Sequence, residues 1–211
     1  MSQDVSTPTR RLLLVTCSAL FAAGCGNLIG PPSSPLRLYV LRPGGGASTH
    51  GPSVTWSLSV ETTTTSDHID SARIALVQAD NSADYYADSA WTDRVPKLVR
   101  DCIVEAFENS NRILAVSAVG DGFYSDYVLQ AELRDFEARY RQSDGIPIVR
   151  VRIKAKIAPT KGREIVGSLN SVHEVAASEN SVPAVVRAFD DALGSVLSDI
   201  VNWSLGAVPP K

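Results

Sequence analysis

Two long stretches of the chain place their apolar residues at helical spacing. Between Ser89 and Ser110 the apolar positions recur every three or four residues, as on one face of an α-helix. They are Trp91, Val95, Leu98, Val99, Cys102, Ile103, Ala106 and Phe107. Pro96 has to lie in the first turn, where a missing amide hydrogen costs least. The regular helix is therefore expected to start at Thr92 or Asp93.

A second helix is predicted from Ser181 to about Trp203. Ser181 is a suitable N-cap, and Pro183 falls in the first turn. The buried stripe of this helix is formed by Val182, Val185, Val186, Phe189, Leu193, Val196, Leu197 and Ile200. At about 1.5 Å per residue the helix is long enough to cross one face of a sheet.

The rest of the hydrophobic pattern is typical of β-strands. Strands are expected at residues 36–41, 54–60, 73–78, 113–119, 127–140, 149–157 and 165–175. Within the longest, the apolar side chains change parity at Asp135, which predicts a β-bulge. The strand, helix and strand of residues 73–119 predict two parallel strands. We therefore predict a single α/β domain, in which two long amphipathic helices pack on a mixed sheet of five or six strands.

A different pattern precedes this domain. Arg10 and Arg11 are followed by a short apolar run, Leu12 to Ala23, and then by Cys25. The run is too short to span a bilayer stably, and the small residues before the cysteine give a peptidase access to the backbone. The segment resembles a bacterial lipoprotein signal, with Ala22 where Leu is preferred. Cys25 would then become the acylated first residue. An ordinary secretory peptide and an uncleaved anchor are the alternatives.

These patterns divide the chain into four parts. We predict a signal peptide over residues 1–24, the lipidated cysteine with a flexible stalk over 25–34, the α/β domain over 35–205 and a loose tail over 206–211. Gly26 and Asn27 follow the cysteine where an inner-membrane lipoprotein would have Asp. This resembles the outer-membrane address of Gram-negative lipoproteins, with the domain facing the periplasm.

The composition limits the classes of partner that the chain can bind and the roles that its cysteines can have. The chain has 20 Lys and Arg against 23 Asp and Glu, so nothing favours nucleic acid as a partner. Cys17 lies in the signal segment and Cys25 is the lipid site, which leaves Cys102 alone and excludes a disulfide within the mature chain. Because Cys102 falls on the apolar stripe of the first helix, we interpret it as a core residue rather than a nucleophile.

The sequence contains no recognisable catalytic or metal-binding motif. It has no Gly-x-Ser-x-Gly, His-Glu-x-x-His or Cys-x-x-Cys pattern. Its histidines are His50, His68 and His173. We expect a protein that is not an enzyme and that needs no metal or cofactor. The opposite hypothesis requires a pocket in which His173 meets Glu174 or another acid and a nucleophile.

Two surface features are candidates for contact with a partner. One face of the strand at 149–157 carries four cations and could meet acidic lipid headgroups or an acidic protein surface. These are Arg150, Arg152, Lys154 and Lys156. The alternative is a solvated face paired with carboxylates such as Glu132 and Glu137. The other feature is an aromatic loop from Ala83 to Trp91.

In this loop Tyr85 and Tyr86 either anchor a partner or fold back over a sheet edge. Trp91 heads the apolar stripe of the first helix and is expected in the core.

Three segments resemble the auxiliary lipoproteins of ABC-type transport systems. They are Asp70–Val77, Tyr85–Val99 and Glu105–Ser110, within a similarity that covers about residues 36–205. The resemblance implies a non-enzymatic, outer-membrane-anchored partner of an MCE (mammalian-cell-entry) protein, in a machine that moves phospholipid or other hydrophobic molecules between two membranes. It is compatible with a homo-oligomer. The alternative is a structural envelope lipoprotein that assists the assembly of outer-membrane complexes.

Overall fold

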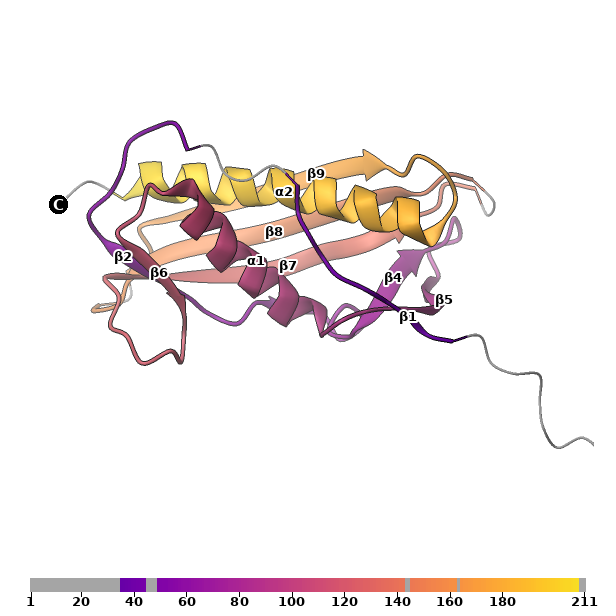
Figure 1. Cartoon of the computed structure of the whole chain (residues 1–211), viewed down its shortest axis with the longest axis horizontal. Coiled ribbons are helices and arrows are strands. Elements are labelled where there is room, and N and C mark those ends of the chain that lie inside the picture. The colour runs from indigo at the N-terminus through magenta and orange to yellow at the C-terminus, as the bar shows by residue number, and fades with distance from the viewer. Residues whose placement is uncertain (1–34, 45–48, 143–144, 163, 209–211) are drawn as a thin grey trace, which may run out of the picture. The chain divides into compact units, whose positions relative to one another are not determined.

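Three long antiparallel strands form one half of a mixed β-sheet (Figure 1). They are β7 (Tyr127–Arg139), β8 (Ile148–Pro159) and β9 (Gly167–Ala176). The pairing of β7 with β8 changes register between Leu133 and Asp135, so Arg134 is an extra residue on β7. The predicted β-bulge is confirmed at this position.

The computed structural model describes residues 35–44, 49–142, 145–162 and 164–208. The predicted signal peptide, Cys25 with its stalk, and residues 209–211 of the predicted tail lie outside this part of the chain. From Leu36 onward the described residues form one compact unit.

The other half of the sheet is built from shorter strands along the second edge of β7. They are β1 (Arg37–Tyr39), β2 (Ser57–Val60), β3 (Thr64–Thr65), β4 (Arg73–Val77), β5 (Ala83–Trp91) and β6 (Ala115–Ala118). β2, β3 and β4 pair with β7 at successive positions, all parallel to it. β6 extends the sheet beyond β2, while β5 and β1 extend it beyond β4.

The α/β fold class with a mixed sheet and two helices is confirmed. The expected number of five or six strands is wrong, because the described residues form nine. β1 and β6 lie within predicted strands, whereas β3 has only two residues, too few for an alternating pattern to stand out in the sequence.

The predicted aromatic loop Ala83–Trp91 is also a strand. As β5 it pairs antiparallel with β4 and parallel with β1. Its first six residues are exposed or half-exposed, so they lack the apolar alternation that reveals a strand. β4 and β6 run in the same direction, as predicted, but β7 and β2 lie between them. The strand that leads into the first helix is therefore β5.

Both helices cover the same face of the sheet (Figure 1). α1 spans Val95–Ser110 and starts later than predicted, because Arg94 still has an extended backbone. Pro96 lies in its first turn, as expected. Among the described residues no helix covers the other face of the sheet, which carries the polar side chains of β7 and β8.

α2 spans Val182–Ala207 and begins as predicted. The Ser181 hydroxyl accepts a hydrogen bond from the backbone N–H of Ala184 at 3.4 Å. The helix continues past Trp203, so Gly206 and Ala207 are helical rather than part of a tail.

Three aromatic rings from different elements form the centre of the core. Trp91 ends β5, Phe136 lies on β7 and Phe189 on α2, and each is at most 1% exposed. The Trp91 and Phe189 rings meet edge to face at 5.3 Å, and the Phe136 and Phe189 centroids are 4.6 Å apart. The expectation that Trp91 packs in the core is confirmed.

A close backbone contact requires glycine at one position of α2. A Cβ on Gly194 would lie 1.9 Å from the carbonyl oxygen of Gly44. Gly194→Ala is expected to lower the free energy of unfolding by about 1–3 kcal/mol, because the backbone at Gly44 must move. Gly206→Ala in the same helix meets nothing within 4 Å and is expected to be neutral or to stabilise by up to about 1 kcal/mol. Urea unfolding measures both, and equal effects would contradict the contact.

Candidate functional site

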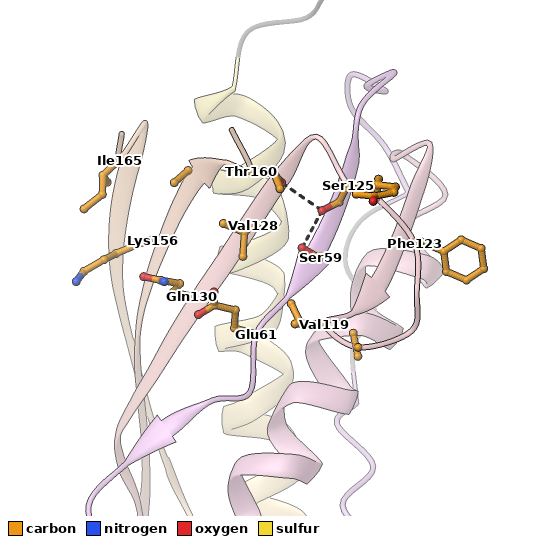
Figure 2. Close-up of a pocket in the computed structure, with 14 residues that line it drawn as sticks. Ser59, Glu61, Val119, Phe123, Ser125, Val128, Gln130, Lys156, Thr160 and Ile165 are labelled. Carbon is orange, nitrogen blue, oxygen red and sulfur yellow. Dashed lines mark hydrogen bonds between the residues drawn. The ribbon is translucent and has the colours of Figure 1, made fainter. Parts of the chain in front are cut away.

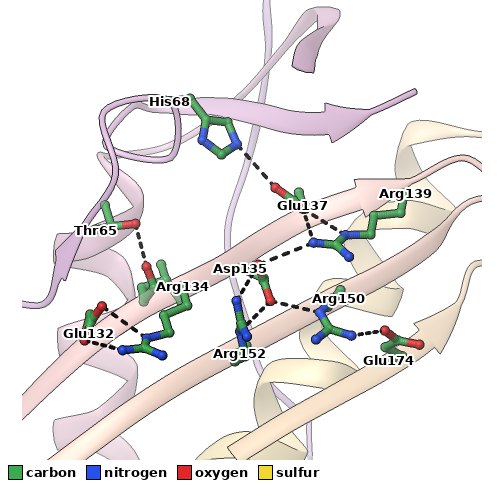
Figure 3. Close-up of polar contacts among 11 residues, drawn as sticks. Thr65, His68, Glu132, Arg134, Asp135, Glu137, Arg139, Arg150, Arg152 and Glu174 are labelled. Carbon is green, nitrogen blue, oxygen red and sulfur yellow. Dashed lines mark hydrogen bonds and ion pairs between the residues drawn. The ribbon is translucent and has the colours of Figure 1, made fainter. Parts of the chain in front are cut away.

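The predicted basic face lies on the helix-free side of the sheet, and its arginines are bound to carboxylates (Figure 3). Asp135 is buried and accepts a hydrogen bond from Nε of Arg150 at 2.9 Å. Nε of Arg152 lies 2.7 Å from the same carboxylate oxygen, and Arg139 lies 3.4 Å from the other. Arg150 also pairs with Glu174. One buried carboxylate therefore holds three guanidinium groups.

The two carboxylates named in the alternative interpretation of this face both form ion pairs, with Arg134 and Arg139 of β7 rather than with the cations of β8. Glu137 accepts a hydrogen bond from Nε of Arg139 at 2.8 Å and lies 3.3 Å from Nε2 of His68. Glu132 accepts two hydrogen bonds from Arg134, at 3.1 and 3.2 Å. The Arg134 guanidinium holds the pKa of Glu132 below its ordinary value. The arginines thus fit the interpretation of a paired outer face.

The lysines of β8 differ from its arginines. Lys154 and Lys156 lie on the same face of the strand, but neither makes an ion pair with another described residue. Their charges help to lower the pKa of Glu132 by electrostatic attraction, without a hydrogen bond or an ion pair. Contact of these two side chains with a partner remains a prediction.

Both candidate tyrosines use their hydroxyls inside the domain. The Tyr85 hydroxyl donates to the carbonyl of His68 at 3.0 Å, and the Arg73 guanidinium lies 3.8 Å from the centre of its ring. The Tyr86 hydroxyl lies 2.8 Å from that of Tyr140, and burial raises the pKa of Tyr86 above its ordinary value. The structure favours the interpretation that these rings fold back over the sheet edge.

His173 meets an acid and a hydroxyl, but not in the arrangement of a nucleophilic triad. Its Nε2 lies 2.8 Å from Oδ2 of Asp199, and the Ser171 hydroxyl donates to the same oxygen at 2.7 Å. These two hydrogen bonds outweigh the effect of burial and hold the pKa of Asp199 below its ordinary value. A triad needs the imidazole between the acid and the hydroxyl. Here the carboxylate of Asp199 lies between them, so the imidazole does not accept the proton of the Ser171 hydroxyl.

Cys102 is 7% exposed on α1, as the helical pattern predicts. Burial raises the pKa of its thiol to about 12. At neutral pH the sulfur is therefore protonated and a poor nucleophile.

A pocket of about 420 Å³ opens on the helix-free face near the start of β7 (Figure 2). Its apolar lining includes Val119, Val128, Ala158 and Ile165. Three hydroxyls lie at one side: Ser125 donates to Ser59 at 2.8 Å and lies 3.4 Å from Thr160. Because Val119 is 54% and Ile165 is 56% exposed, part of the apolar wall faces water.

The loop between β6 and β7 extends this apolar surface. Phe123 is 80% exposed and Tyr124 fully exposed at its tip. Figure 2 shows the Phe123 ring pointing away from the other labelled side chains. Gly120 and Gly122 adopt positive φ values of 111° and 82°, which glycine accepts most readily, and these form the turn before the aromatic pair. Two neighbouring aromatic rings that are exposed to solvent instead of packed in the core are typical of a binding surface.

Only Lys156 of this pocket and loop was a candidate in the sequence. The other residues come from β2, β6, β7, β8 and the segments that follow β2, β6 and β8, and none belongs to a motif. The available signal was the aromatic pair directly after the Gly120–Gly122 turn.

Two classes of feature do not occur in the described part of the chain. No group of three or more His, Cys, Asp or Glu residues is arranged to hold a metal ion there. Nor does any helix within those residues have the length and apolar character needed to cross a membrane.

These observations define a single α/β domain with an ion-paired outer face and an apolar pocket at one end of its sheet. Comparison with known families identifies the chain: residues 39–201 match the model of the ABC-type transport auxiliary lipoprotein component. The chain belongs to this family, so the resemblance seen in the sequence is confirmed. The class of protein is thus the one that the family description gives, an auxiliary lipoprotein component of ABC-type transport.

Solved structures support the same fold. The crystal structure of protein XCC0632 from Xanthomonas campestris is similar with a TM-score of 0.75 and 26% identity, over 81% of this chain and 95% of that one. A crystal structure of an uncharacterized protein has a TM-score of 0.63 at 13% identity, over 80% and 98% of the two chains.

A curated relative, the uncharacterized protein bll6063 of Bradyrhizobium diazoefficiens, is 28% identical over 123 residues. These cover 58% of this chain but 32% of the relative, so the match spans about a third of the relative's length.

Proposed function

We propose that this protein is a non-enzymatic accessory subunit of an MCE/ABC-type system that moves lipid or another hydrophobic molecule between membranes. Acylated Cys25 holds it on the periplasmic side of the outer membrane, where it docks the far end of the MCE assembly. Family membership supports the association with a transporter. The basic and apolar run that ends at Cys25 supports the anchor.

The observation that carries the docking role is the projecting aromatic loop with its pocket. The pocket lies at the Tyr127 end of β7, whereas β1 joins the sheet through β5 and β4 at the Arg139 end. These ends are about 40 Å apart at about 3.3 Å per residue. The aromatic loop thus lies at the end of the sheet away from β1, and in this proposal the assembly from the inner membrane docks there.

Co-purification with the MCE subunit tests this proposal. The full acylated chain, extracted in mild detergent, is expected to retain the MCE subunit, and the variant Phe123→Ala/Tyr124→Ala is expected to lose at least about nine-tenths of it. Ile146→Ala is the control, because Ile146 is also an exposed apolar residue (55%) and lies just before β8, at the other end of the sheet. The Ile146→Ala variant should retain as much MCE subunit as the unchanged chain.

Two further results would contradict the proposal. Equal recovery of the MCE subunit by all three proteins would exclude the aromatic loop as the docking surface. No recovery by the unchanged chain, with recovery of another outer-membrane complex instead, would support the structural alternative. Cys25→Ala tests the anchor separately, since it is expected to release the protein from the membrane fraction.

A further inference from the structure

Three side chains form a row across the helix-free face beside the pocket. Lys156 on β8 pairs in register with Gln130 on β7. Glu61 follows β2, and its backbone N–H donates to the carbonyl of Leu129 at 3.0 Å, which places it beside Gln130 on the other side. In order across the strands, the row consists of the Glu61 carboxylate, the Gln130 amide and the Lys156 ammonium group. All three side chains line the pocket.

One strand separates the two charges in this row, so their backbones are about 10 Å apart, twice the spacing of neighbouring strands. Neither Glu61 nor Lys156 forms an ion pair with another residue of the described ranges. The arginines of the same strand, by contrast, already share the carboxylate of Asp135. The pocket thus presents one free positive and one free negative group.

An apolar wall completes the pocket on the side of the hydroxyls. Val128 and Ala158 lie on neighbouring strands, in register, and the exposed Val119 and Ile165 flank them. A volume of about 420 Å³ falls within the range of pockets that bind small molecules. An apolar wall beside two opposite charges matches a ligand that is itself apolar at one end and dipolar at the other.

We propose that this pocket binds a single-chain amphiphile with a zwitterionic headgroup, one that carries an amine and an acid. The acid meets Lys156, the amine meets Glu61, and the chain covers Val119, Val128 and Ile165. Glu61 would repel a headgroup that is only anionic, and Lys156 one that is only cationic. The inference rests on the proposed function, since it gives the accessory subunit a direct contact with a hydrophobic cargo.

Native mass spectrometry of the full acylated chain tests the site, with palmitoyl lysophosphatidylethanolamine as the probe. We expect one bound probe per chain, held at least about tenfold more tightly than palmitoyl lysophosphatidylglycerol, which has the acid without the amine. Glu61→Gln is expected to remove this preference. Lys156→Gln is expected to weaken both probes about tenfold, while Lys161→Gln, a cation outside the pocket lining, is expected to leave both unchanged.

Filling the pocket tests its location independently of charge. Ala158→Trp is expected to abolish binding of both probes, and Val119→Trp, at a half-exposed position, does the same if the first variant fails to fold. Binding that survives a folded filling variant, or equal binding of both probes by the unchanged chain, would overturn the proposal. Docking is measured separately by co-purification. Loss of probe binding without loss of docking would contradict only the proposed ligand site. Loss of docking without loss of probe binding would contradict only the proposed docking surface.

Discussion

Phe189→Ala is expected to lower the free energy of unfolding by about 3–5 kcal/mol. Phe189 is fully buried on α2 and contacts both Trp91 and Phe136, so its removal leaves a cavity where a helix and two strands meet. Urea unfolding followed by tryptophan fluorescence measures the loss, because Trp56 and Trp91 are both buried in the folded domain. Far-ultraviolet circular dichroism checks that the transition is cooperative.

Phe123→Ala is the matched control for this prediction. Phe123 is 80% exposed, so its removal is expected to change the free energy of unfolding by less than about 0.5 kcal/mol. The two phenylalanines thus separate stability from docking. A large loss of stability in Phe123→Ala would show that the aromatic loop packs against the domain and would contradict its role as a free surface.

Asp135→Ala is expected to cost about 2–3 kcal/mol. The change removes the one acceptor shared by Arg139, Arg150 and Arg152, and the three guanidinium groups then repel each other on one face. They are 24–43% exposed, so water recovers part of the lost solvation and keeps the cost below that of a fully buried pair. Urea unfolding at low and at moderate salt measures it, and added salt should reduce the loss.

Glu132→Ala on the same strand is the control for Asp135→Ala. Its carboxylate is 46% exposed and pairs with Arg134 alone, so water screens the interaction and the loss should stay below about 1 kcal/mol. A second test is the double variant Asp135→Ala/Arg150→Ala. It should be more stable than the sum of the two single changes predicts, because Arg150 is no longer left without its acceptor. Simple additivity would argue against a shared network.

The elements that the sequence predicts well are those with a long regular pattern. The stripe that includes Val99 and Ile103 predicted α1, and the parity change at Asp135 predicted the bulge in β7. β5 was missed because the residues before Ser89 are exposed or half-exposed. They form a strand only because β4 and β1 supply their backbone partners, and neither partner is visible in the segment itself.

The candidate site was harder to predict than the fold. The cations of β8 were visible as an alternating pattern, but the acid that binds Arg150 and Arg152 had been assigned only to a bulge. The bulge itself explains this role: the extra residue, Arg134, changes the register, and Asp135 then pairs with Arg152 across the two strands.

By itself the sequence determined the two helices, the long strands, the α/β class and the family, because periodicity and local motifs are properties of contiguous residues. The tertiary structure alone decided which charges are neutralised and where apolar surface stays exposed. Asp135, Glu137 and Glu174 pair with the arginines of one face, and Glu61, Val119 and Lys156 meet at one pocket although they lie far apart in the chain. The physical reason is that such contacts depend on strand order and register, which bring distant residues together.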